Sequence, residues 1–278
     1  MRVIFGENRM QHCLDNAIKF GMNFTKREVG RTIELDFRKE GGKRNKYFEN
    51  AKENYDGFHL FNMVFCDVKK RVQSGKYVPK EINNDRISVK TICFNPDNIL
   101  KNLNKPCVAI DINYCYWNTI RKLGIISEKI YIEGLKKDKE WKNARNASIG
   151  SLGASVKETV YENGIILNNT IHKRKFNSCR LDAIDYVWEF ANEIISQITD
   201  GFLMYLTDCF FVTLNVKDKV IELIEKGNYT SKFESVTFKK IERKNINNKL
   251  FYVAWIKDND PERYKHQFFN ESNRLKEL

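Results

Sequence analysis

Several features that define large classes of proteins are missing from this sequence of 278 residues. It has no stretch of roughly 18 or more uncharged apolar residues, as a membrane span requires, and it does not begin with the apolar segment of a signal peptide. Its seven cysteines contain no C-x-x-C pair and its four histidines form no cluster along the chain, which argues against a disulfide framework and a structural zinc site. We therefore expect a cytoplasmic protein that does not enter a membrane.

The composition is that of a folded and strongly basic protein. Hydrophobic residues make up 42% and aromatic residues 13% of the chain, which argues for a sizeable core and against disorder. The formal net charge is +12 and the pI is near 9.2. Such an excess favours polyanionic partners, of which the phosphate backbone of a nucleic acid is the commonest. The alternative is that the lysines reflect an AT-rich genome and are merely solvated.

Patterns along the chain divide it into three regions. Residues 1–104 form a mixed basic region with an alternating strand at Thr32–Phe37 and a helix near Tyr55–Arg71. Residues 105–257 are the most regular, and residues 258–278 are expected to be a charged tail. In the central region the patterns predict, in order, three short helices between Cys115 and Leu152, a hairpin over Tyr161–His172, an amphipathic helix over Leu181–Ile198, strands at Phe202–Tyr205 and Cys209–Leu214, a helix over Val216–Lys226, and strands at Phe233–Ile241 and Leu250–Ile256. This mixture predicts an α/β (α+β) fold.

Two aspartates lie where short apolar strands end or turn. Asp111 closes the run Cys107–Ile110, and Asp208 lies between the strands predicted at Phe202–Tyr205 and Cys209–Leu214. Only a sheet that brings these strands together could pair the two side chains. Phosphoryl transfer can use two divalent ions about 3.5–4 Å apart, and Mg²⁺ takes one or two protein carboxylates together with substrate phosphates. The pattern therefore predicts a site for Mg²⁺ or Mn²⁺ at Asp111 and Asp208.

A very basic helix is predicted between the two aspartates. Lys142 and Arg145, together with Lys139, fall on one side of it because they are three residues apart. Such a side could hold a triphosphate opposite the metal ions. The alternative is a solvated basic face, which is the usual fate of such a run.

In the order of these features the chain resembles the palm of family B DNA polymerases. Their first motif, D-x-x-S-L-Y-P, is similar to Asp111–Trp117, which keeps the aspartate and the later Tyr116. Their second motif, K-x-x-x-N-S-x-Y-G, is similar to Lys142–Gly150, which keeps the lysine, the asparagine and the glycine at the same spacing. The Thr-Asp step of their third motif, Y-x-D-T-D-S, is similar to Thr207-Asp208. The segment Tyr205–Asp208 is equally similar to the Y-x-D-D turn of reverse transcriptases.

The resemblance implies a fold and a set of roles. It implies an antiparallel palm-like sheet backed by helices, with small helical fingers at about 118–153. Asp111 and Asp208 would be the catalytic residues and would hold Mg²⁺ or Mn²⁺. Tyr116 would pack under the sugar of the incoming nucleotide and disfavour a 2′-hydroxyl. The residues expected to bind that nucleotide are Tyr116, Lys142, Arg145, Asn146 and Gly150.

The predicted function is template-directed nucleotidyl transfer onto a nucleic-acid 3′ end by a two-metal mechanism. The expected partners are nucleoside triphosphates, a primer–template that is expected to be DNA, and a protein that supplies a missing thumb or processivity. The small size is typical of a phage or mobile-element protein, for which the compartment would be the host cytoplasm. Lys239, Lys240 and Arg243 could grip the primer–template backbone, or they could be a solvated strand face.

Departures from the motifs support a second hypothesis. Leu206 stands where the third motif has its first aspartate, Trp117 replaces a proline, and Ile149 replaces a tyrosine. These changes would suit a catalytically inactive palm that binds nucleic acid or serves in assembly. A metal-dependent nuclease that uses the same aspartates is a third hypothesis. The sequence leaves open whether the template is DNA or RNA, and whether the primer is a nucleic acid or a protein hydroxyl.

Overall fold

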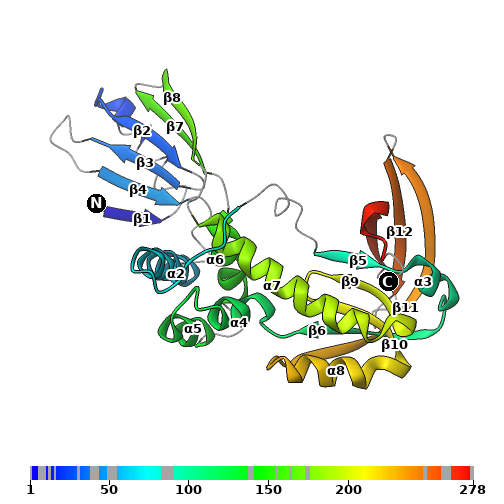
Figure 1. Cartoon of the computed structure of the whole chain (residues 1–278). Coiled ribbons are helices and arrows are strands. Elements are labelled where there is room, and N and C mark those ends of the chain that lie inside the picture. The colour runs from blue at the N-terminus through cyan, green and yellow to red at the C-terminus, as the bar shows by residue number, and fades with distance from the viewer. Residues whose placement is uncertain are drawn as a thin grey trace. The chain divides into compact units, whose positions relative to one another are not determined.

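The computed structural model divides the chain into two compact units (Figure 1). The first consists of Met1–Lys80 and Gly124–Arg180, and the second of Glu81–Leu123 and Leu181–Leu278. The residues that the structure describes are 2–5, 11, 14–15, 17–29, 32–37, 44–48, 55–82, 91–136, 141–153, 156–162, 165–172, 176–246, 249–257 and 264–275.

The first unit contains a six-stranded sheet with the order β1-β4-β3-β2-β7-β8. Neighbouring strands are antiparallel except β1 and β4, which are parallel. The strands are β1 (Arg2–Phe5), β2 (Thr25–Val29), β3 (Thr32–Asp36), β4 (Arg44–Phe48), β7 (Val156–Glu162) and β8 (Ile165–His172). Its helices include α2 (Tyr55–Gln73), α5 (Glu128–Leu135) and α6 (Lys142–Gly153). The predicted strand at Thr32–Phe37 and the helix near Tyr55–Arg71 are thereby confirmed. A hairpin is present as predicted, but it begins at Val156 and not at Tyr161, so the prediction missed most of its first strand.

The second unit contains a seven-stranded antiparallel sheet with the order β13-β12-β11-β6-β10-β9-β5. The strands are β5 (Ile92–Phe94), β6 (Pro106–Ile112), β9 (Phe202–Leu206), β10 (Cys209–Thr213), β11 (Ser231–Ile246), β12 (Lys249–Lys257) and β13 (Tyr264–Asn270). Four of its strands lie in the order β11-β6-β10-β9. The connection from β6 to β9 contains helices and the β7–β8 hairpin of the first unit, and a helix connects β10 to β11. Each connection skips one strand of the sheet, so β6 and β10 lie side by side.

Helices cover one face of this sheet. They are α4 (Cys115–Lys122), α7 (Asn177–Ser196) from residue 181 onward, and α8 (Lys217–Lys226). Val187, Ala191 and Ile195 recur every four residues on α7, so they form one stripe, and they are buried in a core with Ile110 and Phe210 of the sheet. Burial of a large apolar side chain such as Val187 or Ile195 contributes about 1.5–3 kcal/mol. The predicted helices at Leu181–Ile198 and Val216–Lys226 are confirmed, and the second unit has the expected α/β character of an antiparallel sheet backed by helices.

A second core lies on the opposite face of the sheet. It includes Phe94 of β5, Phe238 of β11 and Phe269 of β13, all fully buried. The rings of Phe94 and Phe269 stack with their centroids 4.7 Å apart. Because β5 and β13 are the two outer strands of the sheet, this contact requires the sheet to curl until its edges meet.

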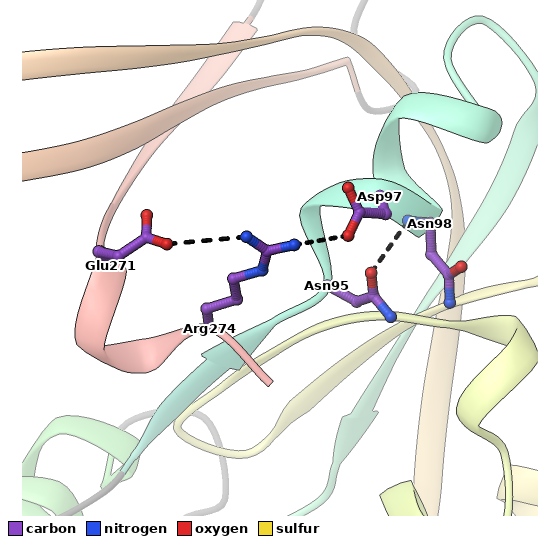
Figure 2. Close-up of polar contacts among 5 residues, drawn as sticks. All are labelled: Asn95, Asp97, Asn98, Glu271 and Arg274. Atoms are coloured by element: carbon purple, nitrogen blue, oxygen red, sulfur yellow. Dashed lines mark hydrogen bonds and ion pairs between the residues drawn. The ribbon is translucent and has the colours of Figure 1, made fainter. Parts of the chain in front are cut away.

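The C-terminal segment closes this curl, as Figure 2 shows. The Leu275 backbone N–H donates to the Phe94 carbonyl oxygen (N···O 2.8 Å). The Arg274 guanidinium lies 2.7 Å from the Asp97 carboxylate of α3 (Pro96–Lys101) and 3.8 Å from Glu271. The segment from Tyr264 to Leu275 therefore belongs to the fold and is not a tail. The prediction of a tail rested on the charges that flank β13, a strand that is itself mostly polar and aromatic and whose Phe269 is buried, while Arg274 remains partly exposed.

Within the described part of the chain, every helix is too short or too polar to cross a bilayer.

Candidate functional site

The sheet of the second unit brings the strands of the two predicted aspartates together. Asp111 lies on β6 and pairs with Cys209, the first residue of β10. Asp208 precedes Cys209 in the turn that joins β9 to β10. The Ile112 backbone N–H donates to the Asp208 carbonyl oxygen (N···O 3.0 Å). Both aspartates therefore lie at the same end of two adjacent central strands.

The alternation of side chains along β6 decides which face Asp111 occupies. Val108, Ile110 and Ile112 point into the core beneath the helices, so Asp111 points to the opposite face. Its side chain retains 34% of its accessible surface. A carboxylate at the rim of a curled sheet is thus reachable from solvent.

Lys232 is the residue of this site that the sequence patterns did not reveal. It pairs with Asp111 across β11 and β6, and its Nζ lies 2.9 Å from the Asp111 Oδ2. The hydrogen bond and the charge of Asp111 raise the pKa of Lys232, and the more distant charge of Asp208 acts in the same direction. The sequence contains no spacing signal for this pair, because it arises only from the register of β11 on β6.

The turn that carries Asp208 has an unusual backbone. Thr207 has a φ of 58°, a left-handed conformation that costs a β-branched residue about 1–2 kcal/mol. The Tyr205 hydroxyl donates to the Thr207 carbonyl oxygen at 2.6 Å, and the Tyr116 hydroxyl donates to the same oxygen at 3.2 Å. The Thr207 N–H donates to the Thr91 carbonyl oxygen (2.7 Å). These contacts hold the turn in place, and they bring Tyr116 of α4 next to the aspartate turn.

Both carboxylates act electrostatically on one buried thiol. Burial, followed by the charges of Asp208 and Asp111, raises the pKa of Cys115 well above its ordinary value. Cys115 is the first residue of α4 and is 2% exposed. The two aspartates therefore create a shared region of negative potential at the end of the sheet.

This region fits a divalent cation in its chemistry. Among the described residues, no cluster of three or more His, Cys, Asp or Glu side chains could hold a metal ion. The site offers the two carboxylates of Asp111 and Asp208. Carboxylates are hard oxygen donors, which Mg²⁺ and Mn²⁺ prefer, and substrate phosphates can complete the coordination. The ammonium of Lys232 shows that the site attracts a positive charge.

The second predicted motif lies on α6, in the first unit. Lys142, Asn146 and Gly150 are exposed and follow each other at four-residue steps, so they share one side of the helix. Arg145 is different, since it is 2% exposed and its Nη1 donates to the Gly134 carbonyl oxygen of α5 at 2.6 Å. The expectation that Arg145 contacts a nucleotide does not agree with this burial; the side chain ties α6 to α5. Lys139 lies outside the described residues.

The three basic residues predicted to grip nucleic acid do not share one face of β11. Lys240 pairs with Trp255 of β12, whereas Arg243 pairs with Tyr252 and points to the opposite face. Lys239 lies at a register shift and its Nζ is 3.2 Å from the Asn104 Oδ1. Lys240 and Arg243 are three positions apart on a regular part of the strand, so they point to opposite faces, and the β-bulge affects only Lys239.

Thiol labelling offers a check on this part of the fold. At pH 8, iodoacetamide is expected to modify the exposed Cys66 and to leave Cys107 and Cys115 unmodified in the folded protein. Burial raises the pKa of Cys107 to about 11, so only about one thiol in a thousand is ionised there at that pH, and the thiolate is the reactive form. Peptide mass spectrometry measures the outcome, with denatured protein as the fully labelled control. Rapid labelling of Cys115 would contradict the packing of α4 on the sheet.

The chain matches no known protein-family model, and neither a curated protein nor a solved structure is significantly similar to it.

Proposed function

We propose that this protein transfers nucleotides from nucleoside triphosphates to the 3′ end of a nucleic acid, directed by a template and assisted by two divalent metal ions. The observation that carries the proposal is the register of β6 and β10, which sets Asp111 beside Cys209 and bonds Asp208 to Ile112. Two carboxylates at the same end of adjacent strands are the minimum that two-metal chemistry requires of a protein.

The residues of the site have distinct tasks in this proposal. The carboxylates of Asp111 and Asp208 would hold Mg²⁺ or Mn²⁺, which when bound neutralises the triphosphate and activates the attacking hydroxyl. Lys232 holds a positive charge beside Asp111 that can contact a phosphate oxygen. Tyr116 lies beside the aspartate turn, where its ring would pack against the sugar of the nucleotide.

The topology supports the proposal. The order β11-β6-β10-β9, in which α7 leads into β9 and α8 connects β10 to β11, is the split β-α-β arrangement. It resembles the palm of family B DNA polymerases in having one aspartate on a central strand and the other in the adjacent hairpin. The same resemblance makes DNA the expected primer–template.

A second candidate is a catalytically inactive palm that binds nucleic acid. The ion pair of Lys232 with Asp111 favours it, because an ammonium already neutralises one of the two metal-binding carboxylates. The exposed turn also has Leu206 in place of a further carboxylate. A protein of this kind would bind nucleic acid with a steep salt dependence and would not need nucleotides.

Primer extension distinguishes the two candidates. The full chain is incubated with a labelled primer–template, deoxynucleotides or ribonucleotides, and Mg²⁺ or Mn²⁺, and the products are separated by size. We expect extension that depends on the template and that stops when the metal is removed with EDTA. If the primer is not extended with either metal and either sugar type, on DNA or on RNA templates, the proposal is contradicted and the inactive palm remains. Degradation of the primer without nucleotides would instead reveal a nuclease.

A further inference from the structure

Strands β11 and β12, seen in orange in Figure 1, pair in a ribbon whose outer edge is β13 along Phe251–Lys257, and one face of β11 and β12 combines lysines with an indole ring. The register pairs Lys240 with Trp255, Lys244 with Phe251, and Thr237 with Lys257. Because paired residues and alternate residues share a face, this side of the two strands also holds Thr237, Ile246, Phe251 and the buried Val253. We give the name lysine–tryptophan face to its charged residues and the indole: Lys240, Glu242 and Lys244 on β11, and Lys249, Trp255 and Lys257 on β12.

The charge of the lysine–tryptophan face is strongly positive. Its four lysines outnumber its single carboxylate, Glu242, by three charges. The side chains of Lys240 and Lys244 are 57% and 47% exposed. Glu242 forms an ion pair with Lys240 and lies 3.6 Å from Lys244, so it spaces the two ammonium groups and does not remove the excess.

Trp255 lies between these lysines. The Nζ of Lys240 is 5.2 Å, and the Nζ of Lys244 is 5.5 Å, from the centroid of its ring, both within cation–π distance. Its neighbours Ala254 and Ile256 are buried in the core on the other face of the ribbon, whereas Trp255 is only partly buried. Packing of the second unit therefore accounts for Ala254 and Ile256, whereas Trp255 lies on the opposite side of β12 with part of its surface exposed beside the two ammonium groups.

We propose that the lysine–tryptophan face binds a single-stranded segment of nucleic acid, with the lysines on its phosphates and a base stacked on Trp255. A positively charged track combined with an aromatic platform is the pattern by which proteins bind single strands without reading their sequence. From Lys249 to Lys257 the strand extends over about 26 Å, enough for several nucleotides. The inference deepens the proposed function and rests on it, because a template-directed enzyme must hold unpaired template.

The test measures binding of a fluorescent oligothymidylate to the full chain by anisotropy at several salt concentrations. The double variant K240Q/K244Q is expected to bind at least about tenfold more weakly, and the slope of log K against log salt is expected to fall by about 1.4, since each phosphate contact to a single strand contributes about 0.7. The matched control is K101Q/K226Q, which removes the same charge from exposed positions on α3 and α8.

The variant W255L removes the stacking plane and keeps an apolar side chain. We expect binding to weaken by about 5- to 100-fold, with an unchanged salt slope, because base stacking carries no ion release. Affinity of K240Q/K244Q within about twofold of the control, or preferred binding of duplex that W255L does not alter, would overturn the inference. K240Q/K244Q changes only exposed side chains, so it decides the question even if W255L fails to fold.

The binding test of the lysine–tryptophan face and the primer-extension test of the proposed function can fail independently of each other. Normal oligonucleotide binding by K240Q/K244Q, together with metal-dependent primer extension, would disprove the lysine–tryptophan face alone. Absence of extension, together with a loss of binding in K240Q/K244Q, would disprove the polymerase proposal and keep the binding face.

Discussion

Replacement of Asp208 by asparagine is expected to lower nucleotide incorporation by about three orders of magnitude or more. A catalytic metal contributes several kcal/mol of transition-state stabilisation, and each 1.36 kcal/mol corresponds to about a factor of ten in rate. Asparagine has nearly the same shape but lacks the charge that a metal ion requires. The backbone bonds of this position, from the Ile112 N–H and to the Leu206 carbonyl oxygen, do not involve the side chain and are retained. The melting temperature should therefore stay within a few degrees.

Asp200→Asn is the matched control for this prediction. Asp200 is exposed and lies just before β9, whereas Asp208 lies just after it, so the same chemical change is made at the other end of one strand. Primer extension under single-turnover conditions measures both variants, with thermal unfolding in parallel. Equal activity of wild type and Asp208→Asn would rule out the assignment of Asp208 as a metal ligand. Loss of activity in Asp200→Asn alone would move the site to the opposite end of the sheet.

Replacement of Phe210 by alanine is expected to lower the free energy of unfolding by about 3–5 kcal/mol, a large part of the total stability of a domain. Phe210 is fully buried beneath the helices, pairs with Ile110 of β6, and has its ring centroid 4.8 Å from that of Tyr205. Alanine would leave a cavity between the sheet and α7 that the surrounding backbone cannot fill. The variant should unfold at a markedly lower denaturant concentration.

Phe211→Ala provides the matched comparison. Phe211 is the next residue on β10, so it points to the opposite face, and it is only partly buried there. Its replacement should cost clearly less than that of Phe210, because less apolar surface returns to water. Urea unfolding followed by circular dichroism measures both changes. An equal or larger loss for Phe211→Ala would show that the orientation of β10 on the sheet is inverted.

Local periodicity predicted the elements of the second unit well. The recurrence of Val187, Ala191 and Ile195 indicated α7, and the apolar runs on either side of Thr207-Asp208 indicated β9 and β10. These elements are visible in the sequence because each must present one apolar face to a core, and that need imposes a period of 3.6 or 2 residues. The strand at Tyr264–Asn270 was missed because its sequence, YKHQFFN, has no regular apolar alternation and the segments on either side of it are charged; its pairing comes from β12, which lies earlier in the chain.

The candidate site was visible in the sequence only in part. Asp111 and Asp208 stood out since each follows an apolar strand, but nothing in the sequence pointed to Lys232 as their companion. Arg145 looked like an exposed member of a basic helix, and yet the packing of α6 on α5 buried it. On β11, the alternation of side chains turns Lys240 and Arg243 to opposite faces, and a bulge between Phe238 and Lys240 displaces Lys239 from the pairing.

By itself, the sequence determined which segments are helices and strands, and it marked the two carboxylates at strand ends, because such features depend on contacts within a few residues. Only the tertiary structure decided that β6 lies between β10 and β11, that Asp111 meets Lys232, and that Lys240 shares its face with Trp255. Strand register joins residues that are far apart in the chain, and a shift by one residue would turn each side chain to the other face. The packing of both faces of the sheet selects one register, and no local pattern contains that information.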